Sequence, residues 1–160
     1  MPRVEHSAIA ERISRLAQRA GASIAVAESL TSGGIAAALG KAPRASDWFM
    51  GGVVAYARSA KHELLNVSDG PVVRASAAEE MAEGVRTLMH ADVSAAVTGA
   101  GGPEPQDGQP DGTVFLAIAT SAGTRVTKLV LKGDPGAVVH GTVTEALLAL
   151  ERALEDDARV

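Results

Sequence analysis

The sequence predicts a single-domain, three-layer α/β/α protein in which helices cover both faces of a mostly parallel sheet that ends in an antiparallel hairpin. Short apolar runs typical of buried strands alternate with segments whose apolar residues recur every three or four positions. Aromatic residues make up only 2% of the 160 residues, whereas glycine occurs 17 times. Ala, Val and Leu must therefore fill the core, and such small side chains suit helices packed on a parallel sheet. No shift in composition marks a linker, so residues 1–160 are expected to form one domain.

The first half of the chain is predicted to contain three helices and two strands. Their approximate ranges, in the order helix, strand, helix, strand, helix, are 9–20, 23–27, 32–40, 48–57 and 59–67. Gly21 follows the first helix at the position where a left-handed C-terminal cap is common. Gly51 and Gly52 interrupt the second strand and indicate either a bulge or a close approach of backbones.

The second half is predicted to contain a helix, a strand, a loop, a hairpin and a last helix, at 76–90, 92–99, 99–112, 113–132 and from 135 onward. Ser76 and Glu79 have the spacing of a capping box. The apolar face of that helix is expected to contain Met81, Val85, Leu88 and Met89. Asp134 is the expected N-cap of the last helix, with Pro135 at its first position. The apolar stripe of the last helix is Val143, Leu147, Leu150 and Leu154.

Composition excludes several classes of function. The net charge of −4 and the scarcity of aromatic residues argue against nucleic-acid binding. The chain has no cysteine, which excludes disulfides and thiolate chemistry, and its four histidines lack metal-ligand spacing. We therefore expect no metal and no cofactor. No run of about 18 apolar residues and no secretory leader is recognisable, which predicts a cytoplasmic protein that does not bind membranes.

Polar residues follow three of the predicted strands at their carboxyl ends, which is where open α/β sheets bind ligands. Glu28–Ser32 follows the first strand, Tyr56 and Lys61 end and follow the second, and Thr98 with Gly99 ends the third. Because the ends of parallel strands meet at one edge, this coincidence is more informative than any single residue. The three segments together predict a small-molecule site.

Within this site, Ser29 can be either a turn hydroxyl or a nucleophile at the start of a helix. A nucleophilic serine needs a base, and a lysine desolvated nearby can serve because burial lowers its pKa. Lys61 is the best-placed lysine, although a solvated helix lysine is the alternative. Tyr56, the only tyrosine, carries the same ambiguity. Glu28 either orients a neighbour or bonds to turn amides.

Glycines and hydroxyls supply the remaining candidates for substrate contact. Thr31, Ser32 and Gly33 are placed where backbone N–H groups at a helix start can stabilise an anion. Thr98 and Gly99 begin the stretch TGAGGP (98–103), a turn of the kind that forms an anion-binding nest. This stretch matches neither the dinucleotide fingerprint nor a P-loop.

Five segments in order resemble the CinA C-terminal domain family, whose characterised members are nicotinamide-nucleotide amidohydrolases. They are VAESLTSGGIAAAL, WFMGGVVAYARSAKHELLNV, VRASAAEEMAEGVR, AVTGAGGPE and QPDGTVFLAIA. The resemblance covers nearly the whole chain. It implies hydrolysis of the carboxamide of nicotinamide mononucleotide, with Ser29 as the nucleophile, Lys61 as its base and Tyr56 hydrogen-bonded in the same cluster. It also implies a homodimer or higher homo-oligomer.

The sequence departs from the family pattern at three places. Ser32 replaces the first glycine of the signature, Leu30 replaces a cysteine, and the last helix begins GDPGAVVHG without the arginines usual there. His140 is the remaining residue in that helix that can contact a substrate phosphate. The alternative function is therefore a weakly active or inactive relative that binds a ligand or partner without turnover. Trp48, Phe49 and Met50 form either an oligomer contact or, as we prefer, part of the core.

Overall fold

The computed structural model describes residues 5–157. Their elements are α1 (His6–Ala20), β1 (Ile24–Glu28), α2 (Gly34–Gly40), α3 (Ala45–Trp48), β2 (Phe49–Val54), α4 (Arg58–Leu65), α5 (Ala75–Leu88), β3 (Val93–Gly99), β4 (Thr113–Thr120), β5 (Gly123–Val130) and α6 (Pro135–Asp157). This order matches the predicted one except for α3, a single turn that precedes the second strand.

The strands form one five-stranded sheet in the order β2-β1-β3-β4-β5. β1 is parallel to β2 and to β3, whereas β4 is antiparallel to both of its neighbours. Only β4 therefore runs against the other strands, and β4 and β5 form the predicted hairpin. β1 and β3 are buried along their whole length, as expected for strands covered on both faces.

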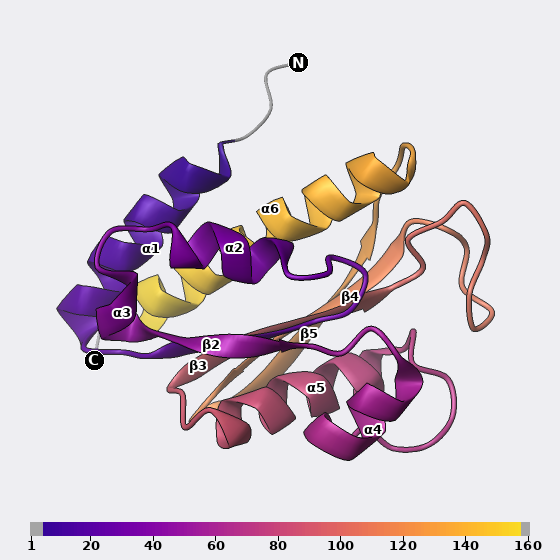
Figure 1. The fold of residues 1–160 in the computed structure, drawn as a ribbon, viewed down its shortest axis with the longest axis horizontal. Helices are drawn as coiled ribbons and strands as arrows, with labels where there is room; N and C mark the ends of the chain where they lie inside the picture. The colour runs from indigo at the N-terminus through magenta and orange to yellow at the C-terminus, as the bar shows by residue number, and fades with distance from the viewer. Residues whose placement is uncertain (1–4, 158–160) are drawn as a thin grey trace.

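Helices cover both faces of the sheet, which confirms the three-layer prediction (Figure 1). α1, α2 and α6 lie on one face, and α4 and α5 lie on the other. Because side chains alternate along a strand, Ile24 and Val26 of β1 join the core beneath α1 and α6, whereas Ala25 and Ala27 join the core beneath α5. Within the described residues, no helix has both the length and the apolar character needed to cross a membrane.

The predicted ends of two helices are confirmed. Gly21 ends α1 in the left-handed conformation at φ 64°. Asp134 precedes α6, and its Oδ1 accepts a hydrogen bond from the N–H of Ala137 at 2.8 Å, as an N-cap does. The apolar stripe of α6 is also buried as predicted.

The predicted capping box of α5 is wrong. The helix begins at Ala75, because the N–H of Ala78 already bonds to the carbonyl of Arg74. Ser76 therefore lies inside the first turn, where its Oγ accepts a hydrogen bond from Arg74 Nε at 2.7 Å. The predicted apolar face is correct for Met81 and Val85, which are buried, and for Met89, which packs partly buried against the same core, but Leu88 ends the helix and is 48% exposed.

Both interpretations of the glycine pair in β2 are correct. The register skips Met50, since Ile24 pairs with Phe49 and Ala25 with Gly51, which marks a bulge. A Cβ on Gly52 would come within 2.6 Å of the carbonyl oxygen of Val26. The bulge also turns Met50 outward, where it is 51% exposed, so the preferred core location is right for Trp48 but wrong for Met50.

Replacing Gly52 by alanine is expected to lower the free energy of unfolding by about 2 kcal/mol, because the added methyl overlaps the backbone of β1. Gly40→Ala is the matched control: nothing lies within 4 Å of the position that its added Cβ would take, and it ends a helix. That control should be neutral or stabilising by up to about 0.5–1 kcal/mol. Urea unfolding of both variants measures the difference. Equal stability of the two variants would contradict the packing argument.

Candidate active site

The turn after β1, the start of α4 and the loop after β3 lie at the same end of the sheet (Figure 1). Two contacts bring these segments together. The N–H of Ala55, just after β2, donates to the carbonyl of Glu28 at 2.8 Å. Gly101 lies against Leu30, whose Cβ is 3.8 Å from the position that a Cβ of Gly101 would take. The predicted convergence of these three segments is therefore present.

The Glu28 carboxylate is fully buried and holds the turn that leads into α2. Its Oε1 accepts hydrogen bonds from Thr31 Oγ1 at 2.6 Å and from the N–H of Ile35 at 2.9 Å. Its Oε2 accepts from the N–H of Ala36 at 2.9 Å. A carboxylate at this position satisfies amides of the first helical turn that would otherwise lack partners. Glu28 therefore bonds to turn amides, and a direct substrate contact for Glu28 or Thr31 stays a prediction.

Glu28→Ala is expected to lower the free energy of unfolding by about 3 kcal/mol or more, because it leaves two amides and one hydroxyl without an acceptor. Thr31→Val removes only one of these hydrogen bonds and should cost about 1 kcal/mol. Chemical denaturation at pH 7 compares the two. Equal losses would show that the carboxylate does not anchor the turn.

Ser29 follows Glu28 and is 8% exposed. It lies just after the last residue of β1, in the bend that leads to α2. Among the described residues, no side chain or backbone group hydrogen-bonds to its hydroxyl. Its carbonyl accepts from the N–H of Ser32 at 3.1 Å, which tightens the turn.

The turn has left-handed backbone at two successive residues. Ser32 has φ 51° and Gly33 has φ 101°. Glycine adopts such angles without strain, which explains why a glycine suits position 32 as well. The N–H groups of Thr31 and Gly33 donate no hydrogen bond within the described chain. Ser32 is exposed, and contact of these residues with a substrate stays a prediction.

Lys61 is buried in α4, with only 1% of its surface exposed. Its Nζ donates hydrogen bonds to the carbonyl oxygens of Ala55 at 2.7 Å and Tyr56 at 3.1 Å. Burial, helped by the neighbouring charge of Arg58, lowers the pKa of Lys61 to about 8. The alternative of a solvated helix lysine is therefore wrong.

Ser29 and Lys61 flank the same residue. The hydrogen bond between Ala55 and Glu28 continues the β1–β2 pairing and places Ala55 opposite Ser29. The carbonyl of Ala55 accepts a hydrogen bond from Lys61 Nζ. No direct hydrogen bond joins the serine hydroxyl to the lysine amine in the described structure.

Tyr56 contacts Lys61 in a different way from the one that the resemblance implied. Its ring is 69% exposed, and the group that bonds to Lys61 is the main-chain carbonyl rather than the phenol. Tyr56 follows the open edge strand of the sheet, where nothing described covers its side chain. A catalytic role for the phenol stays a prediction.

Thr98 and Gly99 have structural partners in β3. Thr98 Oγ1 donates to the carbonyl of Val72 at 2.8 Å and is almost fully buried. A Cβ on Gly99 would come within 2.9 Å of the carbonyl oxygen of Thr113 in the next strand. Both residues thus shape the site edge, and their contact with a substrate is untested.

His140 lies in α6 and packs against α1. Its ring stacks on the ring of His6 with centroids 4.3 Å apart. His6 Nε2 is 2.8 Å from Thr144 Oγ1, whereas His140 Nε2 is buried without a partner among the described residues. Burial and the nearby His140 lower the pKa of His6. The predicted phosphate contact of His140 stays a prediction.

Comparison with known proteins identifies the family. A family model of the CinA C-terminal domain matches residues 6–154. The chain belongs to the CinA C-terminal domain family. It is 38% identical over 144 residues to a CinA-like protein from Frankia casuarinae, an alignment that covers 87% of this chain and 33% of that protein. The chain thus spans about a third of the length of the curated relatives it matches.

Solved CinA structures have the same fold. The crystal structure of a CinA superfamily protein from Klebsiella pneumoniae superposes with a TM-score of 0.91 at 31% identity, covering 96% of this chain and 99% of that one. The competence/damage inducible protein CihA from Agrobacterium tumefaciens gives 0.88 at 28% identity, covering 97% and 99%. The mixed α/β fold is therefore shared with these solved structures.

Asp107 is a residue of this CinA domain that sequence analysis did not single out, and its side chain is only 8% exposed. Its Oδ2 accepts from the N–H groups of Val72 and Val73, at 2.9 and 3.1 Å, and its Oδ1 accepts from Arg58. Its only sequence signal is the Asp-Gly pair, which indicates a turn. The spacing along the chain gives no sign of partners 34 to 49 residues away.

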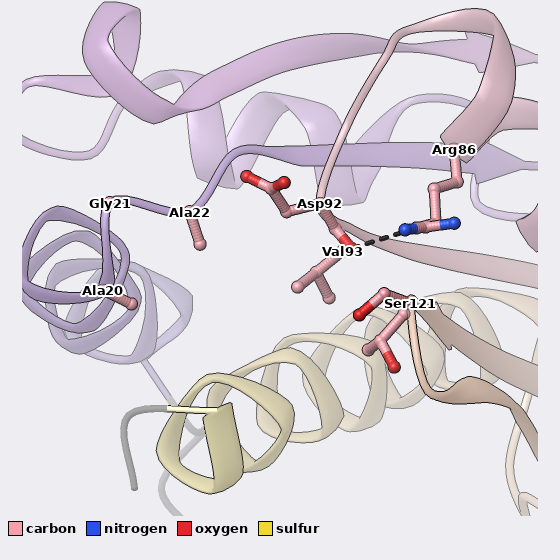
Figure 2. A pocket seen from close by; sticks show the side chains of 8 residues that line it. Ala20, Gly21, Ala22, Arg86, Asp92, Val93 and Ser121 are labelled. Carbon is pink, nitrogen blue, oxygen red and sulfur yellow. Dashed lines mark hydrogen bonds between the residues drawn. The ribbon is translucent and has the colours of Figure 1, made fainter. Parts of the chain in front are cut away.

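Two hollows of the CinA domain lie elsewhere. One of about 200 Å³ is at the opposite end of the strands, where Arg86 Nε donates to the carbonyl of Asp92 at 3.0 Å (Figure 2). Another of about 630 Å³ lies between α6 and the β4–β5 hairpin. Neither is lined by a predicted site residue. Among residues 5–157, no three acidic or histidine side chains gather as metal ligands.

Proposed function

We propose that this CinA domain is an amidohydrolase that converts the carboxamide of nicotinamide mononucleotide, or of a related pyridine compound, to the acid and ammonia. The observation that carries the proposal is the buried amine of Lys61, which donates to the carbonyl of Ala55, the residue that follows β2 and pairs with the end of β1 next to Ser29. A desolvated lysine with a pKa of about 8 is neutral in a useful fraction of molecules near pH 7–8. It can therefore act as a general base without histidine or metal.

The reaction follows from these two groups. Ser29 Oγ attacks the carboxamide carbon while neutral Lys61 takes the hydroxyl proton. The tetrahedral intermediate collapses, the C–N bond breaks, and Lys61 returns the proton to the leaving nitrogen, which departs as ammonia. A water molecule then attacks the acyl ester, with Lys61 again as base, and releases the acid and the serine hydroxyl.

The developing oxyanion needs hydrogen-bond donors that have no other partner. The N–H groups of Ser32, Ile35 and Ala36 are already used within the turn. Those of Thr31 and Gly33 make no bond in the described chain, so they are the donors that we assign to the oxyanion. This narrows the predicted set of helix-start amides to two.

For the substrate phosphate, we propose His140 of α6 as the contact. The first turns of α6 contain His140 but no arginine, so a bidentate guanidinium contact is absent there. We therefore expect the domain to discriminate less strongly between a nucleotide and its riboside than an arginine-containing site would.

The test is to incubate the purified protein with nicotinamide mononucleotide and, separately, with nicotinamide riboside, and to measure ammonia and the acid product. Release of ammonia from either compound supports the proposal, and the ratio of the two kcat/KM values reports on the phosphate contact. Thermal shifts with both compounds but no ammonia would favour binding without turnover. Ligand at a hundred times its Kd adds about 2.7 kcal/mol of stability, which such a shift detects.

A further inference from the structure

One carboxylate in the loop after β3 hydrogen-bonds to two other segments near the site. Asp107 is the centre of this contact, which we call the Asp107 clasp: its oxygens accept from the N–H groups of Val72 and Val73 and from Arg58 Nη2. The Asp107 side chain is almost fully buried, whereas that of Arg58 is 52% exposed. The clasp thus joins three segments distant in sequence, namely the start of α4, the connection before α5 and the loop 100–112.

The clasp adjoins two candidate site residues. Arg58 is the first residue of α4, one helical turn before Lys61. Val72 bonds to Asp107 through its N–H and to Thr98 through its carbonyl. Movement of the loop would therefore displace both the start of the helix that holds Lys61 and the hydrogen bond at the end of β3.

We propose that Asp107 is a positioning residue of the site: its carboxylate fixes the loop after β3 against Val72, Val73 and Arg58, and so sets the surroundings of Lys61. The inference rests on the proposed function for its catalytic consequence, because Asp107 acts through Lys61. Asp107 has left-handed backbone at φ 52°, a conformation that Asp and Asn tolerate better than other residues with side chains.

Charge as well as geometry connects the clasp to Lys61. Arg58 lowers the pKa of Lys61, and Asp107 opposes it by raising that pKa, both acting beside the larger effect of burial. The other titratable groups nearby are engaged elsewhere: His62 Nδ1 lies 2.6 Å from the carbonyl of Val67, and Glu80 of α5 accepts from Ser68. Arg58 and Asp107 are the charged groups that shift the pKa of the amine, and they do so in opposite directions.

Opposite pH shifts in two variants test the proposal. Asp107→Asn keeps an acceptor oxygen and tolerates the backbone, but it removes the negative charge, so the rise of kcat/KM with pH should move to lower pH. Arg58→Met removes the positive charge and should move the same rise to higher pH. Each shift is expected to be roughly half a pH unit, since partial exposure screens the charges. A purely structural loosening would move both variants in the same direction.

Two further variants separate position from charge. Asp107→Ala removes the acceptor, so amide exchange at Val72 and Val73 should accelerate at least tenfold and kcat/KM should fall roughly tenfold. Asp47→Asn, which breaks the exposed pair with Arg44, is the matched control and should change neither quantity. Unchanged exchange in Asp107→Ala, or equal shifts in Asp107→Asn and Arg58→Met, would overturn the proposal.

Failure of the proposed function is distinguishable from failure of the clasp. If the wild type releases no ammonia, the proposed function fails. The titration of Lys61 can then be followed by NMR at its Cε in the same variants. Opposite displacements of that titration, together with faster exchange at Val72 and Val73, still support the clasp, and their absence overturns it.

Discussion

Substitution of Ser29 by alanine is expected to lower kcat for carboxamide hydrolysis by at least about a thousandfold while leaving the fold intact. Loss of the attacking oxygen removes the covalent step, and nucleophile deletions in serine hydrolases have effects of this size or larger. The substitution removes no hydrogen bond, because the Ser29 hydroxyl makes none in the described structure. The free energy of unfolding of the Ser29→Ala variant should therefore stay within about 0.5 kcal/mol of the wild-type value. Steady-state ammonia release and urea unfolding measure the two quantities.

The matched control is Ser121→Ala, which removes an exposed serine from the β4–β5 turn at the opposite end of the strands. It should leave kcat unchanged. Hydroxylamine added to the wild-type reaction should trap the acyl ester as a hydroxamate, and Ser29→Ala should yield none. Turnover that survives the substitution would show that another group attacks the carboxamide.

The sequence was sufficient to place the three segments of the candidate site, which follow β1, β2 and β3, at one end of the sheet. Strand ends in a parallel sheet meet at one edge, and the apolar runs of β1 and β3 are short and continuous enough to be recognised as buried strands. The hairpin and the N-cap at Asp134 follow from equally local signals. Each of these predictions depends on neighbours within a few residues, where backbone geometry leaves few alternatives.

The features that the sequence did not reveal depend on contacts between distant residues. The start of α5 is a local exception: Ser76 has the spacing of a capping residue, yet the helix begins before it because the carbonyl of Arg74 accepts the first helical hydrogen bond. Exposure of Met50 follows from a bulge whose position is set by pairing with β1. Asp107 finds its partners only after three segments have come together. Such long-range pairings leave no periodic signal in a single sequence.

The burial of Lys61 is the feature that joins the fold to the proposed chemistry. No apolar pattern predicts that the lysine of RSAKHELL (58–65) enters the core, because its spacing is equally consistent with a solvated helix. It is buried because two carbonyls at the end of β2, those of Ala55 and Tyr56, extend past the last ladder pair and accept its amine. Burial is the larger cause of the lowered pKa of Lys61, the charge of Arg58 lowers it further, and the charge of Asp107 opposes both.

Lys61→Met is expected to abolish hydrolysis at every pH, whereas kcat/KM of the wild type should rise with pH and level off above about 8. The rise follows because the base must be neutral to accept the proton of Ser29, and the pKa of Lys61 is lowered to about 8. Methionine has a similar volume and no titratable group. A pH profile of the wild type that is flat between 6 and 9 would rule out Lys61 as the base.

Lys61→Met also tests the burial of the amine through stability, independently of activity. In the unfolded chain Lys61 stays protonated up to pH 10.5, but in the folded protein only up to about 8, so its charge opposes folding below pH 8. Between pH 8 and 10.5 that cost disappears. The unfolding free energy of the wild type should therefore rise by about 3 kcal/mol relative to Lys61→Met over this range. The other lysines cancel in the difference, so a constant difference across this range would mean that the amine is solvated and cannot serve Ser29.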